Sequence, residues 1–314
     1  MDSRVSVIIP NYNGMEHLAE CLGSLAEQSY TGFSITVVDN GSEDMSVDYI
    51  RKYFPSADVV ELGRNYGFAR AVNEGIKRAL GNSRPEKILL LNNDVVCDRF
   101  FIENFLKGFD NAKVYSCACR MMNYYDRSVI DDCGISLNRY GHPFASGHGN
   151  RYEENKKYGA GITGCCAGAG MYRTEVFEKI GLFDEDFIAY YEDVDMALRI
   201  KLSGYECGFA GDAVCYHKRG GSYGKVRYYD TEMCSRNLIF LWIKNYTAGF
   251  IFRKFPLFVS GEIRRYYHLL KNLLIKEALY SFRGLLRGIP GIPRMIKKRR
   301  VYSAAEKEIC AKIF

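Results

Sequence analysis

The chain has 314 residues, of which 47% are hydrophobic and 25% are charged, and its formal net charge is +6. This composition excludes a disordered chain and is typical of one large globular domain, or of a domain with an appendage. The eleven cysteines are odd in number and include no CxxC pair, and Cys165, Cys166 and Cys215 lie in apolar runs. We therefore expect buried thiols and a reducing compartment.

The sequence predicts neither a signal peptide nor a transmembrane helix. The first apolar run, VSVIIP at residues 5–10, is too short for the core of a signal peptide. No stretch reaches the roughly 18 uncharged apolar residues that a membrane-spanning helix requires. We therefore expect a cytoplasmic protein.

The first two thirds of the chain alternate between strand and helix patterns. Residues 5–10 and 34–40 are apolar runs rich in β-branched residues, and residues 16–28 between them follow helical spacing. An amphipathic helix at residues 69–80 precedes a third apolar run, KILLLNND at residues 87–94. This order predicts βαβ units and an α/β fold with an open, mostly parallel, twisted sheet flanked by helices.

Each of the three predicted strands ends in short polar residues. The runs are PNYNG at residues 10–14, DNGS at 39–42 and NND at 92–94. Turn formation explains any one of them, but the carboxyl ends of strands in such a sheet converge on a ligand site, which explains all three. The chain contains neither GxGxxG nor GxxxxGK[ST]. The phosphates of a nucleotide bound here would therefore need another binding group, such as a metal ion.

Three carboxylates stand at the start of a predicted helix in AYYEDVDMALRIKLSG, residues 189–204. The apolar residues that follow keep helical spacing, so Glu192, Asp193 and Asp195 lie in or before the first turn. Acids at this position are most often caps or partners of the helix dipole. The alternative is that they take part in chemistry.

Two further residues are candidate metal ligands. Asp94 ends its apolar run, and a carboxylate there suits Mg²⁺ or Mn²⁺ shared with substrate phosphates. His217 follows a later apolar run in VCYHKRGGSYG. A single histidine at a strand end is otherwise a hydrogen-bonded structural residue, and this alternative stays open.

Assembled in chain order, these motifs resemble the inverting family 2 glycosyltransferases of the GT-A fold, and most closely the rhamnosyltransferase-like members. The resemblance covers about residues 4–240. It runs through VSVIIPNYNG, VVDNGSED, RNYGFARAVNEGI, LLLNNDV, GAGMYRTEVFEKIGLFDEDFIAYYEDVDMALRIKLSGY and VCYHKRGGSYG.

The resemblance implies a role for each matched residue. Asp193 would be the general base, Glu192 and the glycine-rich run around Gly164 would lie on the acceptor or sugar side, and Asp195 would pair with Arg199 within the helix. The implied nucleotide-sugar pocket contains Pro10, Tyr12, Asn13, Asp39, Asn40, Arg64, Asn65, Gly67, Asn92, Asn93 and Asp94.

Residues 92–94 take the place of the family's DxD motif, with Asn in place of the first Asp. This departure leaves Asp94 as the only anionic ligand of the three. We expect it to hold a divalent metal, Mg²⁺ or Mn²⁺, together with His217 and the donor diphosphate. Asp39 would hydrogen-bond the pyrimidine.

The C-terminal part differs in charge from the rest of the chain. Residues 251–300 contain thirteen Lys and Arg against two acids, interleaved with aliphatic and aromatic residues at helical spacing. We predict a catalytic domain at residues 1–246 and a basic amphipathic helical region at 247–314. Such a region suits an anionic membrane face, whereas packing on the catalytic domain or in a homodimer is the alternative. No nucleic-acid reading motif accompanies the charges, so we expect no nucleic-acid partner.

The sequence thus predicts a metal-dependent inverting glycosyltransferase, peripheral at the inner face of the cell membrane. It would move a sugar from dTDP-rhamnose or a UDP-hexose to a hydroxyl group of a glycan or lipid-linked acceptor in cell-surface polysaccharide synthesis. The alternative is a catalytically silent nucleotide-sugar-binding scaffold of a glycan assembly complex. A glycoside hydrolase needs two carboxylates but no nucleotide pocket, so it leaves the polar strand ends unexplained.

Overall fold

The computed structural model describes residues 4–154, 156, 158–219, 228–300, 303–311 and 313. Part of the motif VCYHKRGGSYG, residues 220–227, lies outside this range. The strands are β1 (Val5–Asn11), β2 (Phe33–Asp39), β3 (Asp58–Glu61), β4 (Lys87–Leu91), β5 (Val95–Cys97), β6 (Val114–Asn123), β7 (Ile130–Asp132), β8 (Ile135–Leu137), β9 (Pro143–Ala145), β10 (Ala169–Arg173) and β11 (Glu206–His217).

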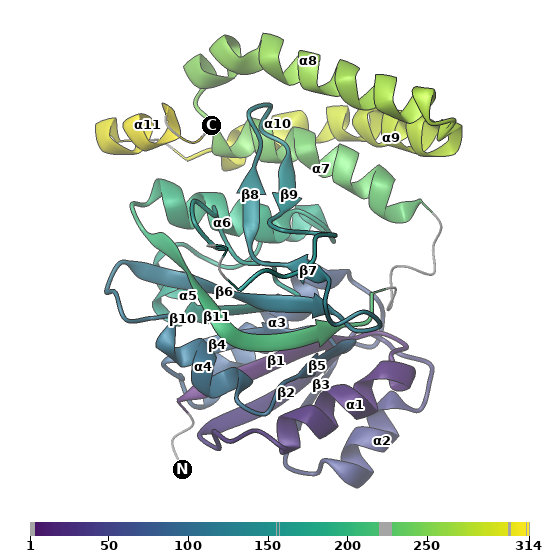
Figure 1. Cartoon of the computed structure of the whole chain (residues 1–314), viewed down its shortest axis with the longest axis vertical. Coiled ribbons are helices and arrows are strands. Elements are labelled where there is room, and N and C mark those ends of the chain that lie inside the picture. The colour runs from purple at the N-terminus through teal and green to yellow at the C-terminus, as the bar shows by residue number, and fades with distance from the viewer. Residues whose placement is uncertain are drawn as a thin grey trace.

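The helices flank the sheet or stand beyond it (Figure 1). They are α1 (Met15–Ala26), α2 (Ser46–Tyr53), α3 (Phe68–Asn82), α4 (Phe101–Lys107), α5 (Glu175–Lys179), α6 (Glu192–Leu202), α7 (Tyr229–Asn245), α8 (Ala248–Lys271), α9 (Ile275–Gly288), α10 (Ile292–Lys298) and α11 (Ala304–Ala311), with 3₁₀ turns at Glu185–Phe187 and Ile289–Gly291.

The main sheet has the strand order β3-β2-β1-β4-β10-β6-β11-β5, with β7 paired to β6. Strands β3, β2, β1 and β4 are parallel, as predicted, and β6 and β11 are parallel as well. Strands β10, β5 and β7 enter antiparallel. The predicted open α/β sheet is confirmed.

Helices cover both faces of this sheet, so its central strands are apolar on both sides. In β1, Val7 and Ile9 join the core beneath α1, whereas Ile8 joins the core beneath α3. This alternation is the period of two that a strand imposes. Helix α1 buries Leu18 and Leu25 on one face, as its spacing predicts.

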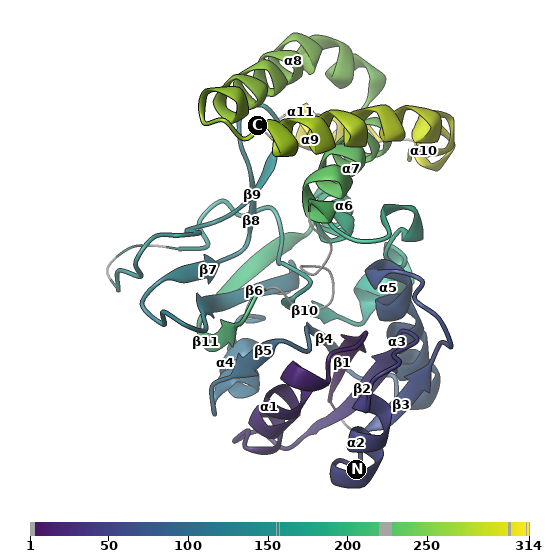
Figure 2. The same ribbon diagram turned by 90° about the vertical axis from the view of Figure 1, so that its right-hand side faces the viewer.

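A second layer of helices, α7 to α11, stands on one side of the sheet, and the hairpin β8–β9 reaches up to it (Figures 1 and 2). Its core is shared with α6, because Leu198 packs in one apolar cluster with Trp242, Phe250 and Met295. Helix α7, which lies before the predicted boundary at residue 246, packs on α9. In the described part of the chain, no helix is long and apolar enough to cross a membrane.

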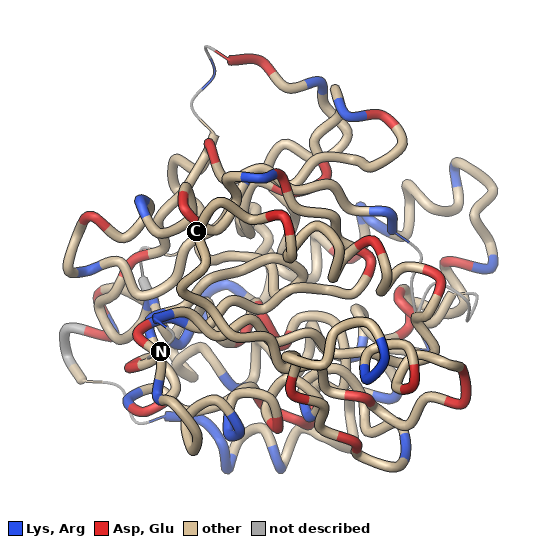
Figure 3. The backbone as a smooth tube through the Cα atoms, turned by 90° about the horizontal axis from the view of Figure 1, so that it is seen from below, with Lys and Arg blue, Asp and Glu red and all other residues tan. Residues whose placement is uncertain are grey.

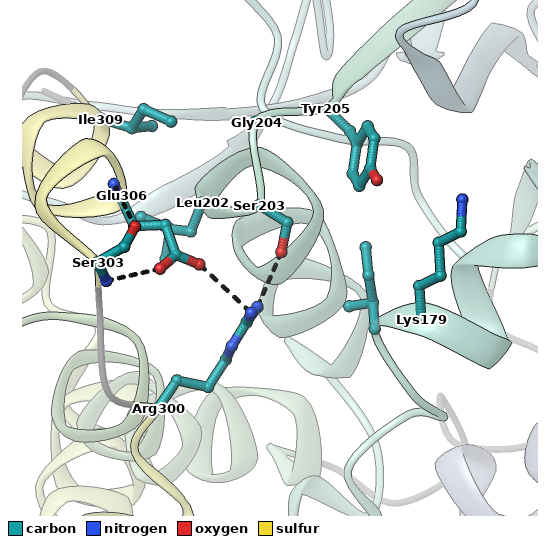
Figure 4. A pocket seen from close by; sticks show the side chains of 10 residues that line it. Lys179, Leu202, Ser203, Gly204, Tyr205, Arg300, Ser303, Glu306 and Ile309 are labelled. Atoms are coloured by element: carbon teal, nitrogen blue, oxygen red, sulfur yellow. Dashed lines mark hydrogen bonds and ion pairs between the residues drawn. The ribbon is translucent and has the colours of Figure 1, made fainter.

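The chain just after α10 also contacts the sheet domain. Arg300 donates to the Ser203 hydroxyl at 2.8 Å, just after α6, and pairs with Glu306 at 3.3 Å beside a hollow of about 480 Å³ (Figure 4). Seen from the side opposite the helical layer, acidic and basic residues are interspersed over the sheet domain (Figure 3). The excess of basic residues lies in the sequence of the helical layer, where residues 251–300 contain thirteen Lys and Arg against two acids.

Candidate active site

A pocket of about 580 Å³ opens where β1 and β4 end, facing the start of α6 and the strand β9. Several residues of the predicted site line it. They are Pro10, Tyr12, Asn40, Asn92, Asn93, Asp94, Glu192, Asp193 and His217. Tertiary structure thus brings together the three polar regions that the sequence suggested: the strand ends, the helix start and the late histidine.

The segment before α6 has an unusual backbone. Ile188, Tyr190 and Tyr191 have φ values of 64°, 67° and 66°, a left-handed conformation that costs a non-glycine residue on the order of 1–3 kcal/mol. The side-chain amide of Asn237, on α7, donates to the carbonyls of Phe187, Ala189 and Tyr190 at 2.9, 2.9 and 2.7 Å. These three hydrogen bonds hold the turn that places Glu192 and Asp193 at the pocket.

Asp193 is a buried carboxylate held by the backbone. Its Oδ1 accepts from the N–H of Val194 at 2.8 Å and its Oδ2 from the N–H of Ala167 at 3.2 Å. Burial raises the pKa of Asp193 above its ordinary value, although these hydrogen bonds oppose the shift. A carboxylate with a raised pKa accepts a proton more readily, as a general base must.

Glu192 stands beside it, buried, and its Oε2 has no hydrogen-bond partner among the described residues. Burial, followed by the charge of Asp193, raises the pKa of Glu192 well above its ordinary value. A buried polar atom without a partner is costly, and here it lines a pocket that a hydroxyl group can enter.

Asp195 has a different role from its two neighbours. It accepts from Arg199 at 2.9 Å, which confirms the predicted i, i+4 pair, and from Lys244 and Asn245 at 2.8 Å each. Lys244 also bridges to Asp184 at 2.8 Å. The N-cap of α6 is Tyr191, whose side chain makes no capping hydrogen bond, and among the acids Asp193 accepts the first-turn N–H of Val194. Asp195 joins α6 to α7, and the other two acids face the pocket.

Asp94 and His217 form a pair at the opposite wall. His217 Nε2 lies 3.3 Å from Asp94 Oδ1, and its Nδ1 lies 2.6 Å from Oδ2 of Asp131 on β7. Burial alone would lower the pKa of the imidazole, but the two carboxylates outweigh it and raise the pKa to about 9. Arg219 also pairs with Asp131.

This donor set fits a divalent cation shared with a substrate. An imidazole whose second nitrogen is held by a carboxylate is a common metal-ligand arrangement, and Asp94 supplies the hard oxygen that Mg²⁺ or Mn²⁺ prefers. The described residues contain no group of three protein ligands. Phosphate oxygens and water would therefore complete the coordination.

A chain of hydrogen bonds links the ends of β1, β2 and β4. Asn93 donates to Asn11 Oδ1 at 2.7 Å, and Asn11 donates to Ser42 at 3.2 Å and to Asp39 at 3.4 Å. Asp39 is buried, and its Oδ2 accepts the backbone N–H of Gly41 and of Ser42. One Asp39 oxygen is thus used by its own turn.

The remaining predicted residues are not part of the wall of the pocket. Those outside the lining are Asn13, Asp39, Arg64, Asn65, Gly67 and Gly164. Asn65 Oδ1 accepts from the amide of Asn40 at 3.0 Å, and the Arg64 guanidinium lies 4.4 Å from the centre of the Tyr66 ring. Asn13 Oδ1 accepts the N–H of Glu43 at 2.7 Å.

Both glycines allow close contact within the protein. Gly67 has a φ of 92°, and a Cβ there would lie 2.6 Å from Cγ2 of Ile188, in the strained turn before α6. A Cβ at Gly164 would lie 2.1 Å from that of Ala197 on α6. The two positions therefore seat α6 and its preceding turn against the sheet.

Several residues of this region were not singled out from the sequence. Asp131 and Asp132 are consecutive on β7, and the strand alternation sends Asp131 to His217 and Asp132 to the pocket. Burial raises the pKa of Asp132 to about 7. The paired acids of IDDCG were a visible signal, whereas Asn237 lies in an ordinary helical pattern and gave none.

Comparisons with known proteins agree with the fold and the family resemblance. The sequence model described as Glycosyl transferase family 2 matches residues 6–181. The chain is 26% identical over 218 residues to O-antigen biosynthesis protein RfbC of Myxococcus xanthus, covering 64% of this chain and 16% of that protein. It is 23% identical over 249 residues to the N-acetylglucosaminyl-diphospho-decaprenol L-rhamnosyltransferase of Mycobacterium tuberculosis, covering 72% of this chain and 79% of that protein.

Two solved structures are similar in fold at low sequence identity. S. aureus TarS 1–349 in complex with UDP-GlcNAc gives a TM-score of 0.61 at 18% identity, covering 93% of this chain and 81% of that chain. The mannosyltransferase PcManGT from Pyrobaculum calidifontis, in complex with GDP-Man and Mn²⁺, gives 0.56 at 18% identity, covering 98% and 79%. These likenesses confirm the predicted GT-A fold.

Proposed function

The chain belongs to glycosyl transferase family 2, and from this premise we propose that it moves a sugar from a nucleotide-diphosphate donor to a hydroxyl group by an inverting, metal-dependent reaction. The donor is dTDP-rhamnose or a UDP-hexose, and the acceptor is a glycan or lipid-linked sugar in cell-surface polysaccharide synthesis. The rhamnosyltransferase relative supports this choice. The observation that carries the proposal is one pocket with Asp193 on one wall and the Asp94–His217 pair on the other.

In this mechanism Asp193 takes the proton of the acceptor hydroxyl as its oxygen attacks the anomeric carbon. The raised pKa suits the carboxylate to that task, and the N–H groups of Val194 and Ala167 aim it. Glu192, with its free Oε2, accepts a hydrogen bond from a second acceptor hydroxyl. Attack from the face opposite the diphosphate inverts the configuration at the anomeric carbon.

Asp94 and His217 would hold the divalent metal together with the diphosphate. A bound cation there would neutralise the charge that develops on the leaving group. Asp131 fixes the His217 ring through Nδ1, so that Nε2 faces Asp94. Asn92 and Asn93 lie beside the same end of the pocket.

The nucleoside lies over the ends of β1 and β2. Pro10, Tyr12 and Asn40 line this side of the pocket, and Asp39 accepts from the pyrimidine N–H through the oxygen that Asn11 reaches at 3.4 Å. Asn65 and Gly67 support Asn40, whose Oδ1 accepts the N–H of Tyr66 at 2.9 Å. Arg64 and Asn13 border the same edge.

The test replaces the proposed base with its uncharged isostere. Asp193→Asn removes the proton acceptor but keeps the shape, so we expect turnover, measured as release of nucleoside diphosphate, to fall at least about 10³-fold. Donor binding, measured by thermal shift with Mn²⁺, stays within a few-fold. Glu192→Gln serves as the matched neighbour and raises the acceptor KM more than it lowers kcat. Retained turnover in Asp193→Asn would remove Asp193 from the base role.

A panel of nucleotide-sugars tests the donor and the class together. We expect one donor to raise the Tm and to be turned over, and EDTA to stop that turnover. Binding of a donor without hydrolysis or transfer to any acceptor would favour the alternative, a catalytically silent scaffold. The presence of the candidate base, Asp193, and of both candidate metal ligands, Asp94 and His217, supports the interpretation as an active enzyme.

We further propose that the enzyme works peripherally at the inner face of the cell membrane, held there by the basic region of residues 247–314. A homodimer is the competing use of the same region. The predicted boundary between residues 246 and 247 stays a proposal, which limited proteolysis of the full chain tests.

A further inference from the structure

Helix α8 carries a continuous row of exposed apolar side chains. The row consists of Phe252, Phe255, Val259, Ile263, Tyr267 and Leu270. Their spacing of three or four residues places them on one face of the helix. Phe252 is 84% exposed, which is unusual for a phenylalanine. The opposite face packs inward through Phe250 and Gly261, where a Cβ would lie 2.7 Å from the Tyr140 side chain.

Helix α9 repeats this arrangement. Its exposed apolar row consists of Ile275, Leu279, Phe282 and Leu286 and continues to Ile289. The opposite face of α9 is made of small residues packed on α7: a Cβ at Gly284 would lie 2.2 Å from the Glu232 carbonyl, and Ser281 bonds Ser235 at 3.0 Å. Leu273, 82% exposed in the turn between the helices, joins the two rows. Together these rows and Leu273 form the apolar face of the helical layer.

Basic side chains border this apolar face on both helices. Arg253, Arg264 and Lys271 follow one flank of α8, and Lys276 and Arg283 follow one flank of α9 at a spacing of seven residues; all are exposed. The acids of the two helices are few. Glu262 is buried against His142 and Arg265, at 3.1 and 2.6 Å, and Glu277 is half-buried.

We propose that the apolar face docks onto an anionic lipid bilayer, with the apolar rows inserted at the interface and the basic flanks on the headgroups. A second copy of the chain is the weaker candidate, because it would bring two sets of exposed cations together, although Arg283 pairs with Glu232 at 3.5 Å. Cationic flanks beside an apolar stripe match an anionic bilayer instead. A hollow of about 680 Å³ lined by Phe252, Phe255 and Arg299 adjoins the apolar face and offers room for an acyl chain.

The docked orientation suits an acceptor carried in the membrane, and this step rests on the proposed function. The hairpin β8–β9 contacts α8 at Tyr140, and its strand β9 lines the catalytic pocket at Pro143 to Ala145. The pocket is also bordered by Asp230 at the start of α7. Its lining therefore reaches the helical layer, on the side that docking brings near the bilayer. Figures 1 and 2 show the hairpin β8–β9 rising from the sheet to that layer.

The experiment is co-sedimentation of the full chain with vesicles of phosphatidylcholine, with and without about 30% phosphatidylglycerol. We expect binding that depends on the anionic lipid and weakens with salt. Phe252→Glu combined with Phe282→Glu lowers the partition coefficient at least tenfold, and Lys271→Gln with Lys276→Gln lowers it about fivefold per charge. Phe100→Glu, at a side chain 49% exposed on the sheet domain, is the matched control and leaves binding unchanged.

Each outcome decides for or against the bilayer. Equal binding by Phe252→Glu/Phe282→Glu and the parent chain overturns the proposal, as does a dimer in analytical ultracentrifugation that these changes dissociate. Release of nucleoside diphosphate from a donor in solution is measured in parallel. If the parent chain releases nucleoside diphosphate but does not bind vesicles, the membrane proposal fails and the proposed transferase activity stands. If it binds vesicles but releases no nucleoside diphosphate, the proposed activity fails and the membrane proposal stands.

Discussion

Asn237 offers the sharpest test of how the fold serves the site, because its side-chain N–H groups donate to backbone carbonyls and the residue lies outside the pocket lining, with its Oδ1 accepting from Arg236 at 2.9 Å. Its amide donates to three carbonyls of the turn at residues 187–190, at 2.7 to 2.9 Å. The two amide hydrogens are shared among the three carbonyls, and a full hydrogen bond of this kind contributes about 0.5–1.5 kcal/mol net. Asn237→Ala therefore lowers the free energy of unfolding by about 2–3 kcal/mol, an effect that is limited because the left-handed turn relaxes when released.

The catalytic consequence is larger than the loss of stability suggests. A displacement of about 1 Å in a catalytic group costs on the order of 100-fold in rate, and the released turn leads directly into Asp193. We expect kcat to fall about 100-fold in Asn237→Ala while the KM for the donor stays within a few-fold. Asn237→Asp, which keeps the volume but loses the N–H donors, shows the same pattern.

Ser235 provides the matched control on the same helix. It is as buried as Asn237, but its hydroxyl bonds Ser281 at 3.0 Å and Thr231 at 2.9 Å, away from the turn. Ser235→Ala costs about 1 kcal/mol and leaves kcat unchanged. A kcat within twofold of the parent in Asn237→Ala, or an equal loss in Ser235→Ala, would refute the reasoning. Denaturant unfolding and initial rates of diphosphate release supply the two measurements.

Three further changes probe other parts of the chain. Gly67→Ala forces a Cβ to within 2.6 Å of Ile188 at a φ of 92°, so thermal unfolding should show a loss of about 2–4 kcal/mol; an unchanged Tm contradicts the close contact. Asp184, between two lysines, has its pKa lowered to about 2, the positive charge of its partners outweighing burial. Its contribution of about 2 kcal/mol is complete above pH ~4 and is lost as the pH falls towards 2, so Asp184→Asn should show a flatter acid-unfolding curve, and an identical curve counts against the pair. Asp131→Asn weakens the hydrogen bond that orients the His217 ring, and it raises the Mn²⁺ concentration for half-maximal turnover about 10–100-fold. An unchanged Mn²⁺ titration would show that Asp131 does not orient His217 for metal binding.

Much of the fold and of the pocket could be predicted from local patterns. The apolar, β-branched run at residues 5–10 and the helical spacing of residues 16–28 specified β1 and α1, because these patterns depend only on neighbours in the chain. Polar runs at three strand ends predicted a shared site, because parallel strands end at one edge. The structure gathers most of those residues into one pocket.

Other features depended on contacts between segments that are distant in sequence. Asn237 meets the turn before α6 from about 50 residues away, and Gly67 is required by Ile188 rather than by its own turn. Asp131 and Asp132 are chemically alike in sequence, and only the path of β7 sends one to His217 and the other to the pocket. Amphipathic spacing predicted a basic helical region with apolar residues at 247–314, and only the structure divides it into α8 and α9. The spacing left open whether those apolar residues were buried, because this depends on what the rest of the chain covers; the structure packs the opposite faces and leaves the apolar rows exposed.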